Sequence, residues 1–225
     1  MKIAVLGTGG VGKAFAQKLI SHGHEVYLGT RNPAESLQKT GEGSLRDFLL
    51  QHPNIHLHSF NDAASYADLL INVCSGAGSP DMLRSILQAH VQGKILIDIS
   101  NPLDFSKGMP PSLLPQYSNT HSLGEELQAL APQAKVVKTL NTMWNGLMLN
   151  PAQLADGDHL NYLCGNDAKA KQQVMQLLNS FGWKNENILD LGDLSGARAT
   201  EATLPIWLRI YGVKKTGAFN FRIVS

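Results

Sequence analysis

The stretch Gly7-Thr8-Gly9-Gly10-Val11-Gly12 decides the fold of this chain. It follows the apolar run Lys2–Leu6, which reads as a buried parallel strand, and it precedes Lys13–Ile20, which reads as a helix. A glycine-rich turn between a strand and a helix is the fingerprint of a dinucleotide-binding unit. The sequence therefore predicts a dinucleotide site at this turn.

The glycines of this turn have separate physical tasks. Gly7 permits a tight turn off the strand, Gly9 lets a pyrophosphate approach the backbone, and Gly12 lets the helix pack close to the strand. The free N–H groups and the positive dipole end of the helix then face the phosphates. We expect the whole turn to bind the cofactor, namely Gly7, Thr8, Gly9, Gly10, Val11 and Gly12.

The residues after the second strand decide which dinucleotide is preferred. Glu25–Gly29 reads as that strand, and an NAD site usually carries Asp or Glu just beyond it to bond the ribose hydroxyl. This chain has Thr30, Arg31 and Asn32 there instead. A carboxylate about 4 Å from a 2′-phosphate would meet roughly 4 kcal/mol of repulsion, whereas a guanidinium binds that phosphate in a bidentate manner. The sequence therefore predicts NADP(H), bound by Thr30, Arg31 and Asn32.

Composition bounds the class of protein. The chain has 225 residues, of which 43% are hydrophobic and 16% charged, and its net charge is +1. These values predict a soluble globular protein with no nucleic-acid and no membrane partner, because there is neither a basic excess nor an apolar run of about 18 residues. The first expected strand begins at Lys2, so no signal peptide is predicted and the expected location is cytoplasmic.

The two cysteines, Cys74 and Cys164, each end an apolar run. Their number and separation match no metal-binding spacing, and a disulfide is not expected in the cytoplasm. We therefore expect two reduced, buried thiols and no metal site.

Strands and helices alternate along the first two thirds of the chain. Further strands are expected at 56–58, 68–73, 94–98 and 135–140, and helix starts at Asn32-Pro33, at Ser79-Pro80 and at the capping box Ser122–Glu125. This alternation predicts an α/β fold in which a doubly wound, mostly parallel sheet carries helices on both faces. We expect residues 1–150 to form an NADP-binding Rossmann core.

The regular alternation of strands and helices ends at Pro151, and residues 151–225 are expected to form a small α+β extension packed on the same domain. The extension should contain a strand at 161–164, a helix at 168–181, a strand at 188–190, a helix at 197–211 and a strand-like alternating tail at 218–224. The last helix and the tail carry more apolar residues than one edge helix needs. We therefore expect a homodimer formed through this C-terminal region.

Ligands of open α/β sheets bind at the carboxyl ends of the strands, so the loops there form the candidate site. Besides the glycine turn, these loops begin at Cys74-Ser75-Gly76, at Ser100-Asn101-Pro102 and at Asn141-Thr142. Their polar side chains are neutral amides and hydroxyls, which orient a nicotinamide but are poor proton donors. A carbonyl usually needs a positioned acid, whereas a flavin or deazaflavin ring spreads the incoming charge itself. The loops therefore favour hydride transfer to a planar ring.

Three further features could supply chemistry, and each has a simpler explanation. His121 precedes the helix after the fifth strand and could act as an acid, although a solvent-facing histidine is the more frequent case. Tyr211 and Lys215 match the Y-x-x-x-K pattern of short-chain dehydrogenases, but the glycine spacing is wrong for that family and chance explains the match better. Met143 and Trp144 could wall a planar ring or belong to the core.

The chain resembles the NADP oxidoreductases that depend on the deazaflavin coenzyme F420, and it is similar to the cytoplasmic reductase domain of the STEAP metalloreductases. The matching stretches are Gly7–Gly12, Gly29–Pro33, Ile99–Leu103 and Val136–Thr142, with Phe219–Ile223 near the C-terminus. The resemblance implies an NADPH-binding fold and hydride transfer to a flavin-like ring.

The same resemblance implies where the cofactor's nicotinamide would bind. The implied pocket consists of Ser75, Asn101, Pro102 and Asn141. Within the loop after the fourth strand, we expect Cys74 and Gly76 to contact the cofactor as well. The residues after the sixth strand match no deazaflavin contact, so the identity of the acceptor stays open.

Three functions remain open at this point. The first is an NADPH-dependent oxidoreductase that acts on a flavin, deazaflavin or related small-molecule acceptor. The second is a small carbonyl or imine reductase that uses His121 or an ordered water as its acid. The third is a non-enzymatic NADP(H) sensor, which the lack of an evident catalytic acid favours.

Overall fold

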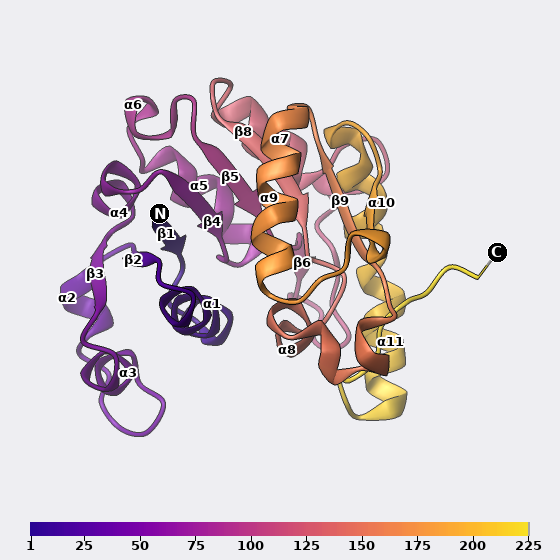
Figure 1. The fold of residues 1–225 in the computed structure, drawn as a ribbon, viewed down its shortest axis with the longest axis horizontal. Helices are drawn as coiled ribbons and strands as arrows, with labels where there is room; N and C mark the ends of the chain where they lie inside the picture. The colour runs from indigo at the N-terminus through magenta and orange to yellow at the C-terminus, as the bar shows by residue number, and fades with distance from the viewer. Residues whose placement is uncertain (225) are drawn as a thin grey trace.

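The computed structural model describes residues 1–224, and eight strands form one sheet in the order β10-β9-β8-β5-β4-β1-β2-β3. The strands are β1 (Lys2–Leu6), β2 (Glu25–Thr30), β3 (Ile55–Ser59), β4 (Leu69–Asn72), β5 (Ile95–Asp98), β8 (Lys135–Thr139), β9 (Asn161–Gly165) and β10 (Ile188–Asp190). Figure 1 shows helices on both sides of this sheet. The expected α/β fold with a mostly parallel sheet is confirmed.

Parallel pairing places the carboxyl ends of six strands along one edge. β3, β2, β1, β4, β5 and β8 are parallel neighbours, and Ile3 in β1 lies between Val26 of β2 and Leu69 of β4. The chain winds outward in opposite directions from β1 and β4, which makes their junction the switch point at which ligands bind in such sheets. The glycine turn after β1 therefore lies beside the loop after β4.

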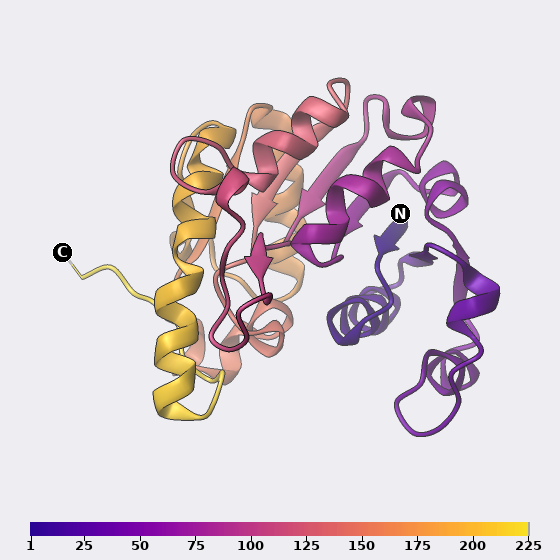
Figure 2. The same cartoon turned by 180° about the vertical axis from the view of Figure 1, so that it is seen from behind.

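Helices cover both faces of the sheet and divide the apolar core in two. One face carries α1 (Gly10–Ser21), α3 (Leu45–Gln51), α8 (Asn145–Leu149) and α9 (Ala168–Ser180). The other carries α4 (Phe60–Tyr66), α5 (Ser79–Arg84), α6 (Gln88–Val91), α7 (Leu123–Leu130) and α10 (Ala197–Ala202). Figures 1 and 2 present these two faces in turn. Strands covered on both faces are mainly apolar, which explains their hydrophobic runs, although Asn72 in β4, Asp98 in β5 and Lys138 in β8 are buried polar exceptions.

Two helix starts have the caps that the sequence predicts. The Glu125 N–H donates to the Ser122 hydroxyl at 3.1 Å, and the Ser122 N–H donates to the Glu125 carboxylate at 2.9 Å, which completes the capping box of α7. Asn32 caps α2 (Pro33–Ser36) by accepting from the Glu35 N–H at 3.2 Å. The short hairpin of β6 (Leu103–Asp104) and β7 (Ser112–Leu113) has no counterpart in the sequence prediction.

The residues after Pro151 continue the same sheet. β9 pairs antiparallel with β8 and parallel with β10, so the extension adds two strands beyond the six parallel ones and β10 forms the edge. The strands expected at 161–164 and 188–190 and the helix expected from Ala168 are all present. Between residues 1 and 224, no helix combines the length and apolar character that crossing a membrane requires.

Two secondary-structure predictions for the C-terminal region are wrong. The single helix expected at 197–211 is two helices, α10 and α11 (Leu204–Lys214), because Pro205 lacks the N–H that a continuous helix needs. The tail expected as a strand forms none within residues 218–224. There the Leu160 N–H donates to the Phe221 carbonyl at 2.9 Å, but the Asn220 side-chain amide donates to the Leu160 carbonyl at 2.8 Å and lies 2.8 Å from His159 Nδ1, so one backbone bond and one side chain hold the tail.

Candidate functional site

The glycine turn between β1 and α1 is tightly constrained on one side and open on the other. Gly7 has a φ of +129°, which L side chains rarely adopt, and its N–H donates to the Gly29 carbonyl at 2.9 Å. A Cβ on Gly12 would lie 2.0 Å from the Gly7 carbonyl oxygen, so α1 can approach only because this residue is glycine. A Cβ on Gly9 or Gly10 would meet no atom within 4 Å, which leaves the outer side of the turn open to a ligand.

Two adjoining pockets open at this turn. One, of about 450 Å³, extends from the turn along α2 to the start of α3. The other, of about 290 Å³, extends from the turn to the loop after β4, where Cys74 and Ser75 line it. Both are lined by Thr8, Gly9, Thr30 and Arg31. Together they form one groove across the carboxyl ends of β1, β2 and β4, where doubly wound sheets bind dinucleotides.

Positive charge collects in the larger pocket. Lys13, Arg31 and Lys39 line it together with one acidic residue, Glu35. Asn32 also lines this pocket, and the Thr30 hydroxyl below it lies 2.8 Å from the hydroxyl of Ser36 in α2. The sequence prediction includes Arg31 but misses Lys13 and Lys39. Lys13 follows the glycine turn directly, which is the signal that could have identified it.

The loops after β4, β5 and β8 are locked to one another beside the groove. The Asn101 amide donates to the Asn141 carbonyl at 2.8 Å, and the Asn141 amide donates to Asn101 Oδ1 at 2.9 Å. Gly76 lies so close that a Cβ there would be 2.0 Å from the Asn101 carbonyl oxygen and 2.8 Å from the Cα of Pro102. The structure thus brings together Gly76, Asn101, Pro102 and Asn141 from three separate loops.

The loop after β8 is strained and holds polar atoms that lack partners. Leu140 has a φ of +60°, which is unusual for a residue other than glycine, and its N–H donates to Asn161 Oδ1 at 3.1 Å. Asn141 Oδ1 and Thr142 Oγ1 are buried, and neither has a hydrogen-bond partner among residues 1–224. Backbone strain and unpaired buried polar atoms concentrate at functional sites.

Two of these features fit NADP(H) along the sheet edge. The cation-lined pocket beside β2 suits a 2′-phosphate, and the open side of Gly9 suits a pyrophosphate. The loop beyond β8 holds the unpaired Asn141 Oδ1, an acceptor of the kind that a carboxamide such as that of nicotinamide uses, but this atom is buried and Asn141 lines neither pocket. The cationic pocket and the open glycine turn therefore suit the two phosphate groups of the cofactor.

His121 lies apart from this groove. Its ring nitrogens are 3.8 Å and 3.5 Å from the carboxylates of Glu125 and Glu126, and its ring centroid is 6.1 Å from that of Tyr117. The groove lining, which comes entirely from the described residues, does not include His121. The structure places this histidine among acidic side chains of α7.

Met143 and Trp144 have different surroundings after β8. Met143 is buried in the core, whereas Trp144 is 42% exposed. The Trp144 indole covers Gly146 and Gly217, because a Cβ on either glycine would lie 2.4 Å or 2.7 Å from indole atoms. Trp144 therefore joins the start of α8 to the segment after α11. Tyr211 belongs to an aromatic stack on α11, away from the glycine turn.

Both cysteines are free thiols, and neither is poised to react. Burial raises the pKa of Cys74 to about 12, and it raises the pKa of Cys164 to about 12. The Cys74 thiol donates to the Leu6 carbonyl at 3.2 Å. Among residues 1–224, no group of three or more His, Cys, Asp or Glu side chains could hold a metal ion.

Replacing Cys74 or Cys164 by alanine is expected to leave hydride transfer within a few-fold of the wild-type rate. At neutral pH both thiols stay protonated, and the thiolate is the reactive form of cysteine. Steady-state rates of the two variants, with circular dichroism to confirm folding, provide the check. A loss on the order of a hundredfold in a folded variant would overturn this expectation.

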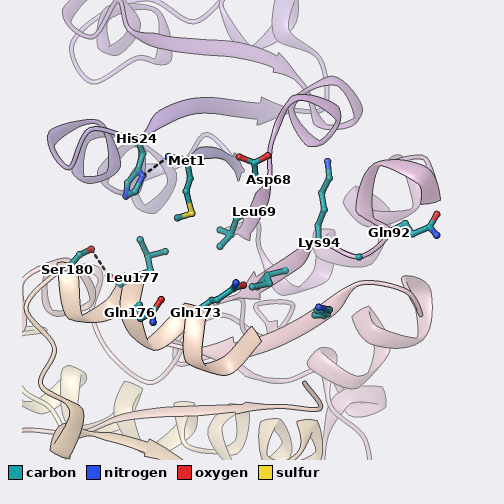
Figure 3. Close-up of a pocket in the computed structure, with 13 residues that line it drawn as sticks. Met1, His24, Asp68, Leu69, Gln92, Lys94, Gln173, Gln176, Leu177 and Ser180 are labelled. Atoms are coloured by element: carbon teal, nitrogen blue, oxygen red, sulfur yellow. Dashed lines mark hydrogen bonds between the residues drawn. The ribbon is translucent and has the colours of Figure 1, made fainter. Parts of the chain in front are cut away.

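A more voluminous cavity, of about 690 Å³, lies at the opposite, amino-terminal edge of the sheet (Figure 3). Met1, Asp68 and Lys94 line it next to the starts of β1, β4 and β5. Its charged groups already have partners: Lys94 Nζ donates to the Ala64 carbonyl at 2.8 Å, and Asp68 accepts from the Lys2 N–H at 3.1 Å. Its volume alone does not make this cavity the cofactor site, because in open α/β sheets the loops that bind ligands follow the carboxyl ends of the strands.

Comparison with known proteins shows the family to which the chain belongs. Residues 2–102 match the family model of coenzyme F420-dependent NADP oxidoreductases. A crystal structure of a candidate F420-dependent NADP reductase from Arthrobacter sp. FB24 is 48% identical in sequence, with a TM-score of 0.95 and coverage of 100% of both chains. The similarity to this structure therefore includes the C-terminal extension.

Two more distant proteins are similar to this chain, one in sequence and one in fold alone. The metalloreductase STEAP3 of Rattus norvegicus is 27% identical over 212 residues, which are 92% of this chain. The chain spans only 38% of the length of that relative. An imine reductase from Myxococcus stipitatus is alike in fold alone, with 16% identity, a TM-score of 0.61 and coverage of 95% of this chain and 63% of its own.

Proposed function

Because this chain belongs to the family of coenzyme F420-dependent NADP oxidoreductases, we propose that it transfers a hydride between NADP(H) and a flavin-like or deazaflavin ring. Family membership makes it an NADPH-dependent oxidoreductase, so the proposal concerns the acceptor and the residues that act. One observation supports a planar ring above others: the interlocked side chains of the loops after β5 and β8, Asn101 and Asn141, are neutral amides, which are poor proton donors.

The proposal assigns the residues of the groove to the parts of the cofactor. The 2′-phosphate end consists of Lys13, Thr30, Arg31, Asn32 and Lys39. The pyrophosphate faces the turn formed by residues 7–12. The nicotinamide end is assigned to Cys74 and Ser75, which line the smaller pocket, and to Gly76, Asn101, Pro102 and Asn141, which pack beside that loop and line neither pocket. When bound, NADPH supplies a hydride from its nicotinamide ring.

The work of the protein is then alignment rather than proton transfer. The reciprocal pair of Asn101 and Asn141 holds two loops in one relative position, and Gly76 packs a third loop against them. Buried and interlocked loops present the two rings to each other with little freedom, which can supply much of the barrier reduction. An acceptor ring that delocalises the incoming charge needs no acid from the chain.

An acceptor screen tests this proposal. NADPH oxidation is followed with FMN, FAD, a 5-deazaflavin, a quinone and simple carbonyls under identical conditions. The proposal expects turnover with at least one tricyclic ring and none with the carbonyls. Turnover with carbonyls or imines alone, in an enzyme that binds NADPH, would contradict it.

Replacing His121 by alanine separates this proposal from the carbonyl or imine reductase. Since His121 lies among Glu125, Glu126 and Tyr117 outside the groove lining, we expect turnover of a ring acceptor to change by no more than about twofold. Steady-state kinetics and an NADPH titration of the variant are the measurement. Loss of nearly all activity with intact NADPH binding would instead favour the carbonyl or imine reductase.

The assembly proposal is a homodimer formed through the C-terminal region, in a reducing compartment such as the cytoplasm. On α11, Ile206 is 52% exposed, Tyr211 is 42% exposed and Val213 is 84% exposed, and Ile223 in the tail is 58% exposed. Apolar side chains gathered on one outer helix support a contact with a second copy. The two free thiols support the location.

Light scattering at micromolar concentration is expected to give the mass of a dimer. Ile206→Glu should shift that mass toward the monomer, since it places a charge where the two copies would meet. Lys184→Glu, on an exposed loop of the extension, is a control that should leave the mass unchanged. A strictly monomeric wild type would count decisively against the dimer.

A further inference from the structure

A buried charge network lies beneath the loops that follow β5 and β8. The Lys138 side chain on β8 is fully buried, and its Nζ lies 2.8 Å from Asp98 Oδ2, 2.9 Å from Glu201 Oε1 and 2.6 Å from the Ser100 carbonyl oxygen. Although burial opposes the charge, the carboxylates of Asp98 and Glu201 raise the pKa of Lys138. Lys138 is therefore an ammonium group whose three protons all have acceptors.

The two carboxylates carry the network into neighbouring elements. Asp98 Oδ1 accepts from the Asn72 amide at 2.9 Å, from the Ser100 N–H at 3.0 Å and from the Ser100 hydroxyl at 2.7 Å. Glu201 on α10 accepts from the first two N–H groups of α7, at 2.9 Å and 3.0 Å. The network thus joins the ends of β4 and β5 to β8, to α7 and to a helix of the C-terminal extension.

Such a network is a weak source of stability. Desolvation of three charges is unfavourable, and apolar side chains of the same volume are often equally or more stabilising than a buried ion pair. The contacts of the network, in contrast, are highly specific in position. Lys138 fixes the carbonyl of Ser100, and the next residue is Asn101, whose side chain pairs with Asn141.

We propose that Lys138, held by Glu201, is a positioning residue that sets the place of the Ser100-Asn101 turn at the nicotinamide end of the groove. The inference rests on the proposed assignment of that end to Asn101 and Asn141. Asn101 follows the carbonyl that Lys138 binds, and Asn141 comes three residues after Lys138, so one ammonium group constrains both partners of the amide pair. Through Glu201, the C-terminal extension acts on the site without touching the cofactor.

The double variant Lys138→Met/Glu201→Gln tests this inference. It removes one positive and one negative charge, so the net charge of the cluster is unchanged while the tie to Ser100 is lost. The matched control is Arg198→Met/Glu125→Gln, which removes a surface ion pair between α10 and α7, where Arg198 Nε lies 2.9 Å from Glu125 Oε2. Glu201→Gln alone is the milder variant if the double variant fails to fold.

Three readouts separate positioning from a general loss of structure. Adenosine 2′,5′-bisphosphate, which has the 2′-phosphate but no nicotinamide, should bind the variant within about twofold of wild type, because no residue of the network lines its pocket. The kcat with a ring acceptor should fall by about 100-fold, as expected for a reactant displaced by about 1 Å. The hydride transfer should also become less stereospecific, as measured with NADPH that carries deuterium on one or the other face of the nicotinamide.

The outcomes are distinguishable. Equal losses of bisphosphate binding and of turnover would overturn the positioning inference. A control variant whose kcat falls as far as that of the test variant would overturn it as well. A wild type that binds NADPH but reduces no ring would mean that the proposed function fails, and the inference would then be judged by the fluorescence of bound NADPH. In that case a lower fluorescence with unchanged bisphosphate binding supports positioning, and unchanged fluorescence contradicts it.

Discussion

Replacing Arg31 by alanine is expected to weaken NADPH binding by about 10- to 150-fold and to leave NADH binding almost unchanged. The reason is that a charge-assisted contact to the 2′-phosphate contributes roughly 1.5–3 kcal/mol, and NADH has no such phosphate. Arg31 lines the pocket in which Lys13 and Lys39 also lie, beside the buried Thr30. Part of the phosphate affinity therefore remains in the variant, and the lower half of the range applies if the lysines compensate.

The charge reversal Arg31→Asp is the stronger form of this test. A carboxylate at that position repels the 2′-phosphate and can accept from a ribose hydroxyl, so the variant should prefer NADH. Lys184→Ala removes a positive charge from an exposed loop that lines neither pocket, and it should change neither affinity. The measurement is a titration of NADPH and NADH against the wild type and the Arg31→Ala, Arg31→Asp and Lys184→Ala variants. Equal affinity of the wild type for NADH and NADPH would contradict the predicted preference for NADPH.

Replacing Gly9 by alanine is expected to weaken NADPH and NADH alike, by roughly 10- to 150-fold, without destabilising the protein. A Cβ on Gly9 meets no protein atom within 4 Å, so the fold accepts it. The added methyl group instead occupies the open side of the turn, which the pyrophosphate of either cofactor must approach. Loss of affinity for both cofactors distinguishes this position from Arg31.

Two other glycines provide the controls for Gly9. Gly12→Ala should destabilise the protein by about 1–3 kcal/mol or more, since its Cβ would lie 2.0 Å from the Gly7 carbonyl. Gly212→Ala lies in α11 with open space around it and should leave binding unchanged. Thermal unfolding and cofactor titration are measured on each variant. A Gly9→Ala protein that binds both cofactors normally would show that the pyrophosphate does not cross this turn.

The sequence predicts the glycine turn and the strand and helix around it well because these signals are local. The glycine turn, the strand before it and the helix after it are adjacent in the chain. The position that carries a carboxylate in NAD sites follows the next strand, β2, and is Arg31 here. Parallel strands that are buried on both faces can also be recognised in the sequence as apolar runs. These features place Gly7, Gly12 and Arg31 before any coordinates are known.

The rest of the site depends on contacts between distant residues, which local periodicity does not report. Lys138 and Glu201 are far apart in the chain, and each alone looks like an ordinary charged residue of a strand or helix. Only the sheet order brings α10 over β8 and makes them a buried pair. The tail fails as a strand for a similar reason, since it makes one backbone bond to Leu160, through the Phe221 carbonyl, and the Asn220 side chain binds the Leu160 carbonyl.

The central claim is that the chain passes a hydride directly between NADPH and a planar ring held at the amide-lined end of the groove. The most direct test uses NADPH deuterated at the transferable position and a 5-deazaflavin as the acceptor, because a hydride received by carbon does not exchange with water. We predict that the deuterium is found on the ring carbon of the reduced deazaflavin, from one face of the nicotinamide only. Reduced deazaflavin without deuterium from either labelled face, or no reduction of any ring by a protein that binds NADPH, would contradict the account.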